Sequence, residues 1–141
     1  MAELVHEPID TAALLARASR PDCGAVVLFM GTTRDHHEGR RVVRLAYECY
    51  ERMALPALER LEREARERHA IEGCVVIHRL GEVPPSEASV AVVVTAHHRG
   101  AAFEACRWLM DELKRSVPIW KKERFADGGD AWVEGHPLSR S

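Results

Sequence analysis

The sequence predicts an α+β fold with a mostly antiparallel sheet, two main helices and a short N-terminal helix. Three observations support this prediction. Helix-like and strand-like segments follow one another along all 141 residues, without an internal repeat or a linker. Two long segments place apolar residues at helical spacing. The apolar strands are short and are joined by brief turns. The length suits a single domain over residues 1–141.

The first elements are a short helix and a buried strand. Asp10 can cap a helix that runs through about Ser19. Its apolar side consists of Leu14, Leu15 and Ala18. Residues 23–30 form a continuous apolar run rich in Val, which is typical of a buried strand. Residues 31–41 are polar and predict a loop.

A half-buried strand and the first long helix come next. Apolar and more polar residues alternate there, which indicates a strand with one face inward. The apolar positions of that strand are Val43, Leu45, Tyr47 and Cys49. Helical spacing then predicts a helix over residues 53–69, with Pro56 in its first turn. Its apolar stripe consists of Leu55, Leu58, Leu61 and Ala65.

The C-terminal half repeats the order of strands and then helix. Residues 75–80 and 89–96 predict two strands joined by a turn at residues 84–86. A second main helix is expected over residues 101–116, and Pro118 ends it. Its apolar stripe consists of Phe103, Cys106, Met110 and Leu113. Two short strands, at residues 119–125 and 131–133, flank the turn at residues 127–129.

The balance of charge excludes some functions. The chain has 20 Lys and Arg residues against 22 Asp and Glu residues, and its pI is near 6.4. Broad nucleic-acid binding needs a basic excess, so we do not expect a nucleic-acid partner. A local cationic pocket is still compatible with this balance. No segment is long enough to span a bilayer and no secretory signal is evident, so we expect a cytoplasmic protein without a membrane partner.

The cysteines and histidines do not follow a metal-binding pattern. None of the four cysteines forms a CxxC pair, and each lies in an apolar segment, so buried reduced thiols are expected. The eight histidines show no HExxH spacing. We therefore expect neither a metal nor a cofactor.

Three cationic segments are candidates for chemistry. His98 and Arg99 lie where a strand ends and a helix begins, and a helix N-terminus favours anions. Lys114 and Lys121 flank Pro118, and a turn there can bring Lys121 back near Lys114. Two neighbouring amines depress each other's pKa, which makes a neutral amine available. Arg34 follows the first buried strand. Taken singly, each segment is better explained as a solvated turn, a solvated basic surface or an ordinary loop than as a site of chemistry.

Together and in this order, the segments resemble the large, catalytic subunit of molybdopterin synthase. The resemblance covers roughly residues 21–134. The stretches that support it are residues 29–34, 45–50 with 53–54, 77–82, 96–99 with 102–103, 110–114, 118–123, and 128 with 132–134. The piece from Lys114 to the Pro-Ile-Trp-Lys-Lys-Glu sequence at residues 118–123 is the most telling.

This resemblance implies an α/β-hammerhead-like fold and a sulfurtransferase of molybdenum cofactor biosynthesis. The family is a homodimer that takes up two copies of a small ubiquitin-like sulfur carrier, giving a heterotetramer. The carrier's C-terminal Gly-Gly thiocarboxylate enters a pocket, where cyclic pyranopterin monophosphate becomes molybdopterin. By position, Lys114 and Lys121 match the catalytic lysines. The matching substrate-binding residues are Arg34, His98, Arg99, Phe29 and Met110.

Two departures and two rival interpretations remain. The loop after Arg34 carries an extra histidine, and the roles of His36 and His37 are open. The short tail also leaves the role of Arg140 open. A noncatalytic module could use the same fold to hold a ubiquitin-like partner or a phosphorylated metabolite. A small nucleic-acid-binding domain is the second rival, and the charge balance disfavours it.

Overall fold

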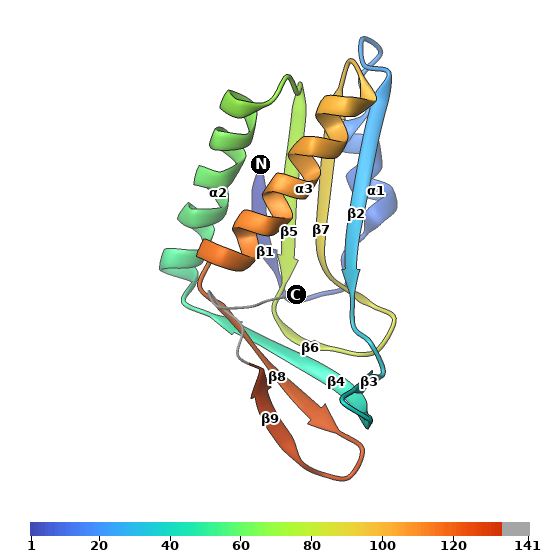
Figure 1. Ribbon diagram of the computed structural model, residues 1–141, viewed down its shortest axis with the longest axis vertical. Helices are drawn as coiled ribbons and strands as arrows, with labels where there is room; N and C mark the ends of the chain where they lie inside the picture. Colours follow the sequence, from blue (N-terminus) through green and yellow to red (C-terminus); the bar gives the residue numbers. More distant parts are fainter. Residues whose placement is uncertain (134–141) are drawn as a thin grey trace.

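The computed structural model describes residues 1–133 and shows an α+β fold, as predicted (Figure 1). The helices are α1 (Thr11–Ala18), α2 (Glu51–Arg68) and α3 (Arg99–Ser116). The first strands are β1 (Ala2–Val5), β2 (Ala25–Thr32), β3 (His36–His37), β4 (Arg40–Cys49) and β5 (Gly73–Arg79). The remaining strands are β6 (Gly81–Val83), β7 (Ala88–Ala96), β8 (Ile119–Phe125) and β9 (Asp130–Val133).

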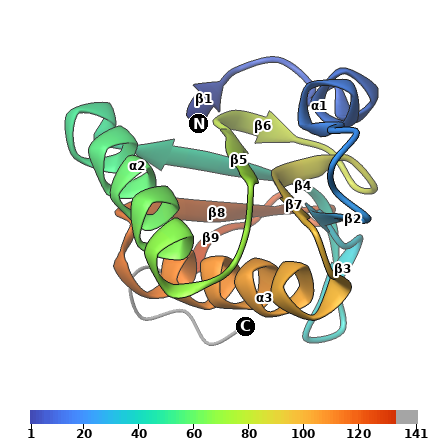
Figure 2. The same cartoon turned by 90° about the horizontal axis from the view of Figure 1, so that it is seen from above.

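The main sheet has four strands in the order β1-β5-β7-β2. All its neighbours are antiparallel except β1, which runs parallel to β5. Helices α2 and α3 cover one face and α1 covers the other, so the sheet is the middle layer of three (Figure 2). Every residue of β7 is buried, because this strand is central in the sheet and covered on both faces.

A second sheet forms beyond one end of the first. Its strands follow the order β3-β4-β8-β9, and β6 also pairs with β4. All these pairs are antiparallel. In Figure 1 these strands lie below the main sheet and run across its direction. A short link connects α3, which packs on the main sheet, to β8 of the second sheet. Residues next to this link therefore lie where the two sheets meet.

Three strands were not predicted. β1 and β6 are too short to show a clear alternation of apolar residues. The segment predicted as a loop, residues 31–41, contains the hairpin of β3 and the start of β4. Its turn residues Glu38 and Gly39 have φ angles of 51° and 80°, the left-handed values that two-residue hairpin turns require.

Several burial predictions were wrong. The strand predicted over residues 23–30 is only partly buried, because β2 lies at the edge of the sheet. Phe103 is 59% exposed, although it was placed on the apolar stripe of its helix. Cys23 and Cys49 are half-buried rather than buried. Helix α2 begins at Glu51, two residues early, so Pro56 lies in its second turn and not in its first.

Adjacent leucines in α1 give a test of the core. Asp10 caps this helix by accepting a hydrogen bond from the Ala13 N–H at 3.0 Å. Leu14 is 1% exposed and packs on the main sheet, whereas Leu15 is 39% exposed. We expect Leu14→Ala to lower the free energy of unfolding by about 2–5 kcal/mol. The matched Leu15→Ala should cost less than about 1 kcal/mol in the same urea titration. Equal losses would contradict this placement of the helix.

Candidate active site at the junction of the two sheets

The two candidate lysines are brought together by the link between α3 and β8. Lys114 lies in the last turn of α3, and Lys121 is the third residue of β8. Pro118 separates the helix from the strand, because proline cannot continue a helix. Both side chains line the same cavity, so the predicted return of Lys121 toward Lys114 is what the structure shows.

The cavity has a volume of about 170 Å³ and lies between the main sheet, α3 and the second sheet. Phe29 of β2 and Met110 of α3 also line it, as the sequence suggested. The remaining lining residues are Gly31, Thr32, Tyr47, His78, Ser89, Val90, Leu113 and Ile119. An apolar wall with two amines at one side can enclose an extended chain end and bind its charged terminus.

Burial lowers the pKa of Lys121, and the neighbouring charge of Lys114 lowers it further. Glu123 opposes this effect by raising the pKa of Lys121, and Arg34 adds to the lowering. Burial also lowers the pKa of Lys114, which is influenced by Asp111 and Arg34. The depression is not mutual: Lys114 lowers the pKa of Lys121, whereas the pKa of Lys114 is lowered by burial and by Arg34. Lys121 is therefore the better candidate for a proton acceptor.

Arg34 lies close enough to both lysines to act on their charges. It follows the end of β2, where the pairing with β7 shifts register between Gly31 and Thr32. Gly31 is needed there because a Cβ atom would lie 2.8 Å from Cγ1 of Val90. This close approach lets β2 end beside the cavity, so the loop that follows can present a guanidinium to an anion.

Sequence analysis missed Glu123. Its carboxylate is buried, and it lies two residues after Lys121 on the same face of β8. His37, whose role was open, places Nδ1 3.6 Å from Oε2 of Glu123 and Nε2 3.2 Å from Oε1 of Glu38. The Lys-Lys-Glu sequence was noted as a whole, but only the strand alternation separates its inward residues, Lys121 and Glu123, from Lys122.

Tyr47 and His78 also contribute to the cavity and were not predicted as site residues. Tyr47 pairs with Lys121 across β4 and β8, so the two side chains lie on one face of the sheet. The Tyr47 and His78 rings meet edge to face, with centroids 5.0 Å apart. Burial raises the pKa of Tyr47, so its hydroxyl stays protonated and can donate a hydrogen bond.

His98 and Arg99 are not brought to this cavity within one chain. His98 is the N-cap of α3 and Arg99 is its first residue, as expected of a strand-to-helix junction. Lys114 lies in the last turn, so the helix separates it from Arg99 by about 22 Å. Arg140, whose role was also left open, lies outside the described residues.

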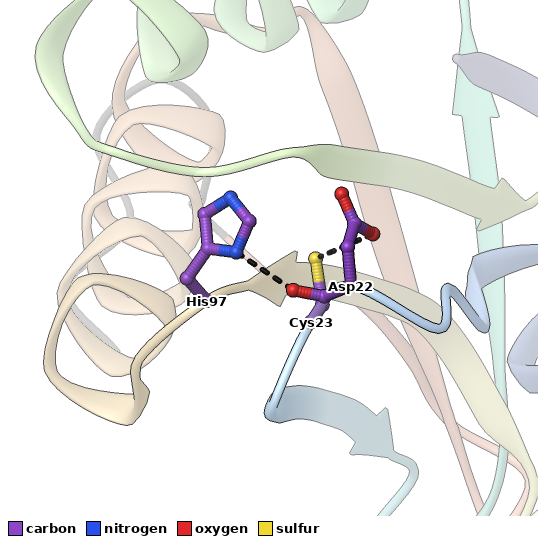
Figure 3. Close-up of side chains that lie close together, drawn as sticks. All are labelled: Asp22, Cys23 and His97. Atoms are coloured by element: carbon purple, nitrogen blue, oxygen red, sulfur yellow. Dashed lines mark hydrogen bonds between the residues drawn. The ribbon is translucent and has the colours of Figure 1, made fainter.

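One other group of side chains has the atoms needed to bind a metal ion. Within residues 1–133, Asp22, Cys23 and His97 place ligand atoms within 4.8 Å of one another (Figure 3). They lie at the Arg99 end of the molecule, away from the lysines. The lysine cavity itself is lined by amines and apolar groups, with a single imidazole from His78. These amines suit an anionic ligand better than a cation.

Fold and site together define a class of protein: a small α+β enzyme subunit with two amines in one cavity. The model of the MoaE protein family matches residues 4–116, and the chain belongs to this family. The resemblance noted in the sequence is thereby confirmed. No helix within residues 1–133 has the length and apolar character needed to cross a membrane.

Individual relatives agree with this assignment. The molybdopterin synthase catalytic subunit of Pyrococcus abyssi is 44% identical over 121 residues, covering 86% of this chain and 81% of the relative. That of Culex quinquefasciatus is 46% identical over 127 residues, covering 89% and 81%. The crystal structure of molybdopterin synthase from Staphylococcus aureus matches with a TM-score of 0.87 and 33% identity, over 93% of this chain and 95% of that one.

Proposed function

We propose that this chain is a sulfurtransferase of molybdenum cofactor biosynthesis that converts cyclic pyranopterin monophosphate to molybdopterin. The observation that carries the proposal is the convergence of Lys114 and Lys121 on one cavity, with Arg34 close enough to act on the charges of both amines. The proposed substrate carries a phosphate and the proposed sulfur donor ends in a thiocarboxylate, so both reactants are anionic. A cavity with cationic side chains, in a chain whose net charge is nearly balanced, provides the positive charge that both anionic groups need for binding.

Each residue has a role that follows from its position. Arg34 holds an anionic group at the mouth of the cavity, and Phe29 and Met110 pack against the bound chain end. The donor's sulfur forms a bond to a side-chain carbon of the pterin as a carbon–oxygen bond of the cyclic phosphate breaks. Water then hydrolyses the acyl–sulfur bond, which leaves the sulfur on the pterin and releases the carrier as a carboxylate. A second carrier supplies the second sulfur in the same way. Lys121 accepts and returns the protons that these steps move, since its lowered pKa makes the loss of its proton easier than for an ordinary lysine. Lys114 stabilises the developing negative charge.

The sulfur donor would be a small ubiquitin-like carrier with a C-terminal Gly-Gly thiocarboxylate. A solved complex of subunits 1 and 2 of the molybdopterin-converting factor from Helicobacter pylori has the same fold, with a TM-score of 0.79 at 21% identity. The small, partly apolar cavity can hold an extended tail whose residues have no bulky side chains, as in Gly-Gly. The cytoplasmic location expected from the sequence stays a prediction.

We also propose a homodimer whose two copies complete each other's sites. Tyr50 and Trp132 are 65% and 56% exposed, and with Trp120 they line an aromatic hollow on the second sheet. Exposed aromatic groups of this kind favour a protein interface. In a dimer, the partner's copy of Arg99 can approach the lysines that it cannot reach within one chain. A heterotetramer then has two carriers and two cavities.

Reconstitution tests the proposal directly. The purified chain is mixed with thiocarboxylated carrier and cyclic pyranopterin monophosphate, and the dithiolene product is measured. Formation of the product supports catalysis. Binding of both ligands without any product would support the noncatalytic module instead. Loss of all binding with rising salt, together with affinity for nucleic acid, would favour the second rival.

The charges around Lys121 predict two shifts of opposite sign. Arg34→Gln removes a positive neighbour, so the pKa of Lys121 should rise. Glu123→Gln removes a negative neighbour, so the pKa of Lys121 should fall. Each change should move the titration midpoint of the Lys121 amine, followed by NMR, by roughly one pH unit or less. In a plot of reaction rate against pH, the part of the curve that depends on the neutral Lys121 amine should move in the same direction. Shifts of the same sign in both variants would contradict this arrangement.

A further inference from the structure

We propose that Asp22, Cys23 and His97 form a binding site for a divalent transition-metal ion, with Zn²⁺ as the best match. No metal was predicted from the sequence, because it contains no metal-ligand motif at short spacing. Here 74 residues separate the cysteine from the histidine, and the fold brings them together (Figure 3). A thiolate, an imidazole and a carboxylate are the three ligand types that Zn²⁺ accepts in proteins.

The sheet register holds the three residues in place. Ala25 of β2 pairs with Ala96 of β7, and this is the last pair at that end of the sheet. Cys23 and His97 lie just beyond this pair on adjacent strands. The ligand atoms lie within 4.8 Å of one another, and Sγ of Cys23 is 3.6 Å from Oδ1 of Asp22. Metal–ligand distances of about 2.0–2.3 Å require this group to contract only slightly.

The imidazole of His97 is already oriented by its neighbours. Nδ1 lies 2.7 Å from the backbone carbonyl of Asp22, and Nε2 lies 3.5 Å from Oε2 of Glu72. A carboxylate beside the second ring nitrogen is a common feature of metal-binding histidines, because it fixes the ring and strengthens the ligand. When Nδ1 turns from the carbonyl to the metal, Nε2–H can donate to Glu72.

Arg20 is the cation that now occupies the site. Its guanidinium donates to both carboxylate oxygens of Asp22, at 3.1 and 3.2 Å, and lies 3.8 Å from Glu72. This pair is exposed and contributes little to stability, so a divalent ion can displace it. Metal binding would therefore replace the Arg20 guanidinium with the metal ion beside the carboxylates of Asp22 and Glu72. The thiol of Cys23 loses its proton to solvent as the metal–sulfur bond forms, so affinity should increase with pH.

The test uses the full-length, tag-free, reduced chain titrated with Co²⁺ and then with Zn²⁺. We expect one ion per chain and a thiolate-to-cobalt charge-transfer band, which Zn²⁺ abolishes by displacement. Cys23→Ser should remove the band, and His97→Gln should weaken binding roughly tenfold or more. Cys49→Ser is the matched control, because Cys49 is also half-buried but lies outside this group. It should bind as the wild type does.

Arg20→Gln distinguishes a built site from nonspecific binding. Removing the competing guanidinium should strengthen Co²⁺ binding severalfold, whereas a purely structural role of Arg20 would leave affinity unchanged or lower it. The proposal is overturned if no band forms with stoichiometric Co²⁺ near neutral pH. It is equally overturned if Cys23→Ser keeps the band while Cys49→Ser loses it. Neither readout depends on sulfur transfer, so the outcome is independent of the proposed enzymatic function.

Discussion

Lys121→Ala should lower the rate of dithiolene formation by roughly 10²-fold or more, the range expected when a general acid–base group is removed. The amine of Lys121 is half-buried in the cavity, and burial together with Lys114 lowers its pKa. Its loss removes the amine whose proton is made easiest to transfer by burial and by the charge of Lys114. The measurement is a single-turnover reaction with thiocarboxylated carrier and cyclic pyranopterin monophosphate, in which product is quantified over time.

Lys122→Ala is the matched control for this prediction. Lys122 is the next residue on β8 and points to the opposite face, where its amine lies 3.6 Å from Asp130 and 5.4 Å from the ring centre of Trp132. Its removal should change the rate less than about threefold, because an exposed ion pair contributes little. Equal losses in the two variants would show that the strand, and not the amine at 121, is needed. Sulfur transfer that survives Lys121→Ala at the wild-type rate would show that the Lys121 amine does not carry the proton in this reaction.

The long periodic elements of the fold were predictable from the sequence. The stripe of α2 and the cap at Asp10 are local signals that tertiary packing did not override. β1 and the hairpin of β3 with β4 were not predictable, since they depend on pairing partners far along the chain or on a turn with left-handed residues. The exposure of Phe103 shows a further limit: helical spacing identifies an apolar face but not what covers it.

The candidate site was predictable only in part. The pairing of Lys114 and Lys121 followed from the proline between them, which forces a change of direction. Strand register places Tyr47 in the cavity and Glu123 near Lys121, with His37 beside Glu123, and no spacing rule in the sequence encodes that register. The group at Asp22 and His97 was missed for the same reason, because its members meet only across two antiparallel strands.

Mixing two inactive variants should restore activity if the site is shared between copies. Lys121→Ala and Arg99→Ala should each inactivate the homodimer, the first through proton transfer and the second through anion binding. In a mixed dimer, one cavity has its own lysine and the partner's intact copy of Arg99. After subunit exchange, random pairing should restore about one quarter of wild-type activity, since half the dimers are mixed and each has one intact cavity.

The same experiment separates the shared site from a site within one chain. Arg99 lies at the start of α3 and Lys114 near its end, so about 22 Å of helix must be bridged by a second copy for both to act on one substrate. If Arg99 served only its own chain, no mixed dimer would contain a complete cavity, and mixing would restore nothing. If Arg99→Ala alone retained full activity, the guanidinium would have no part in catalysis. Recovery on mixing requires both the dimer and the contribution of Arg99 across it.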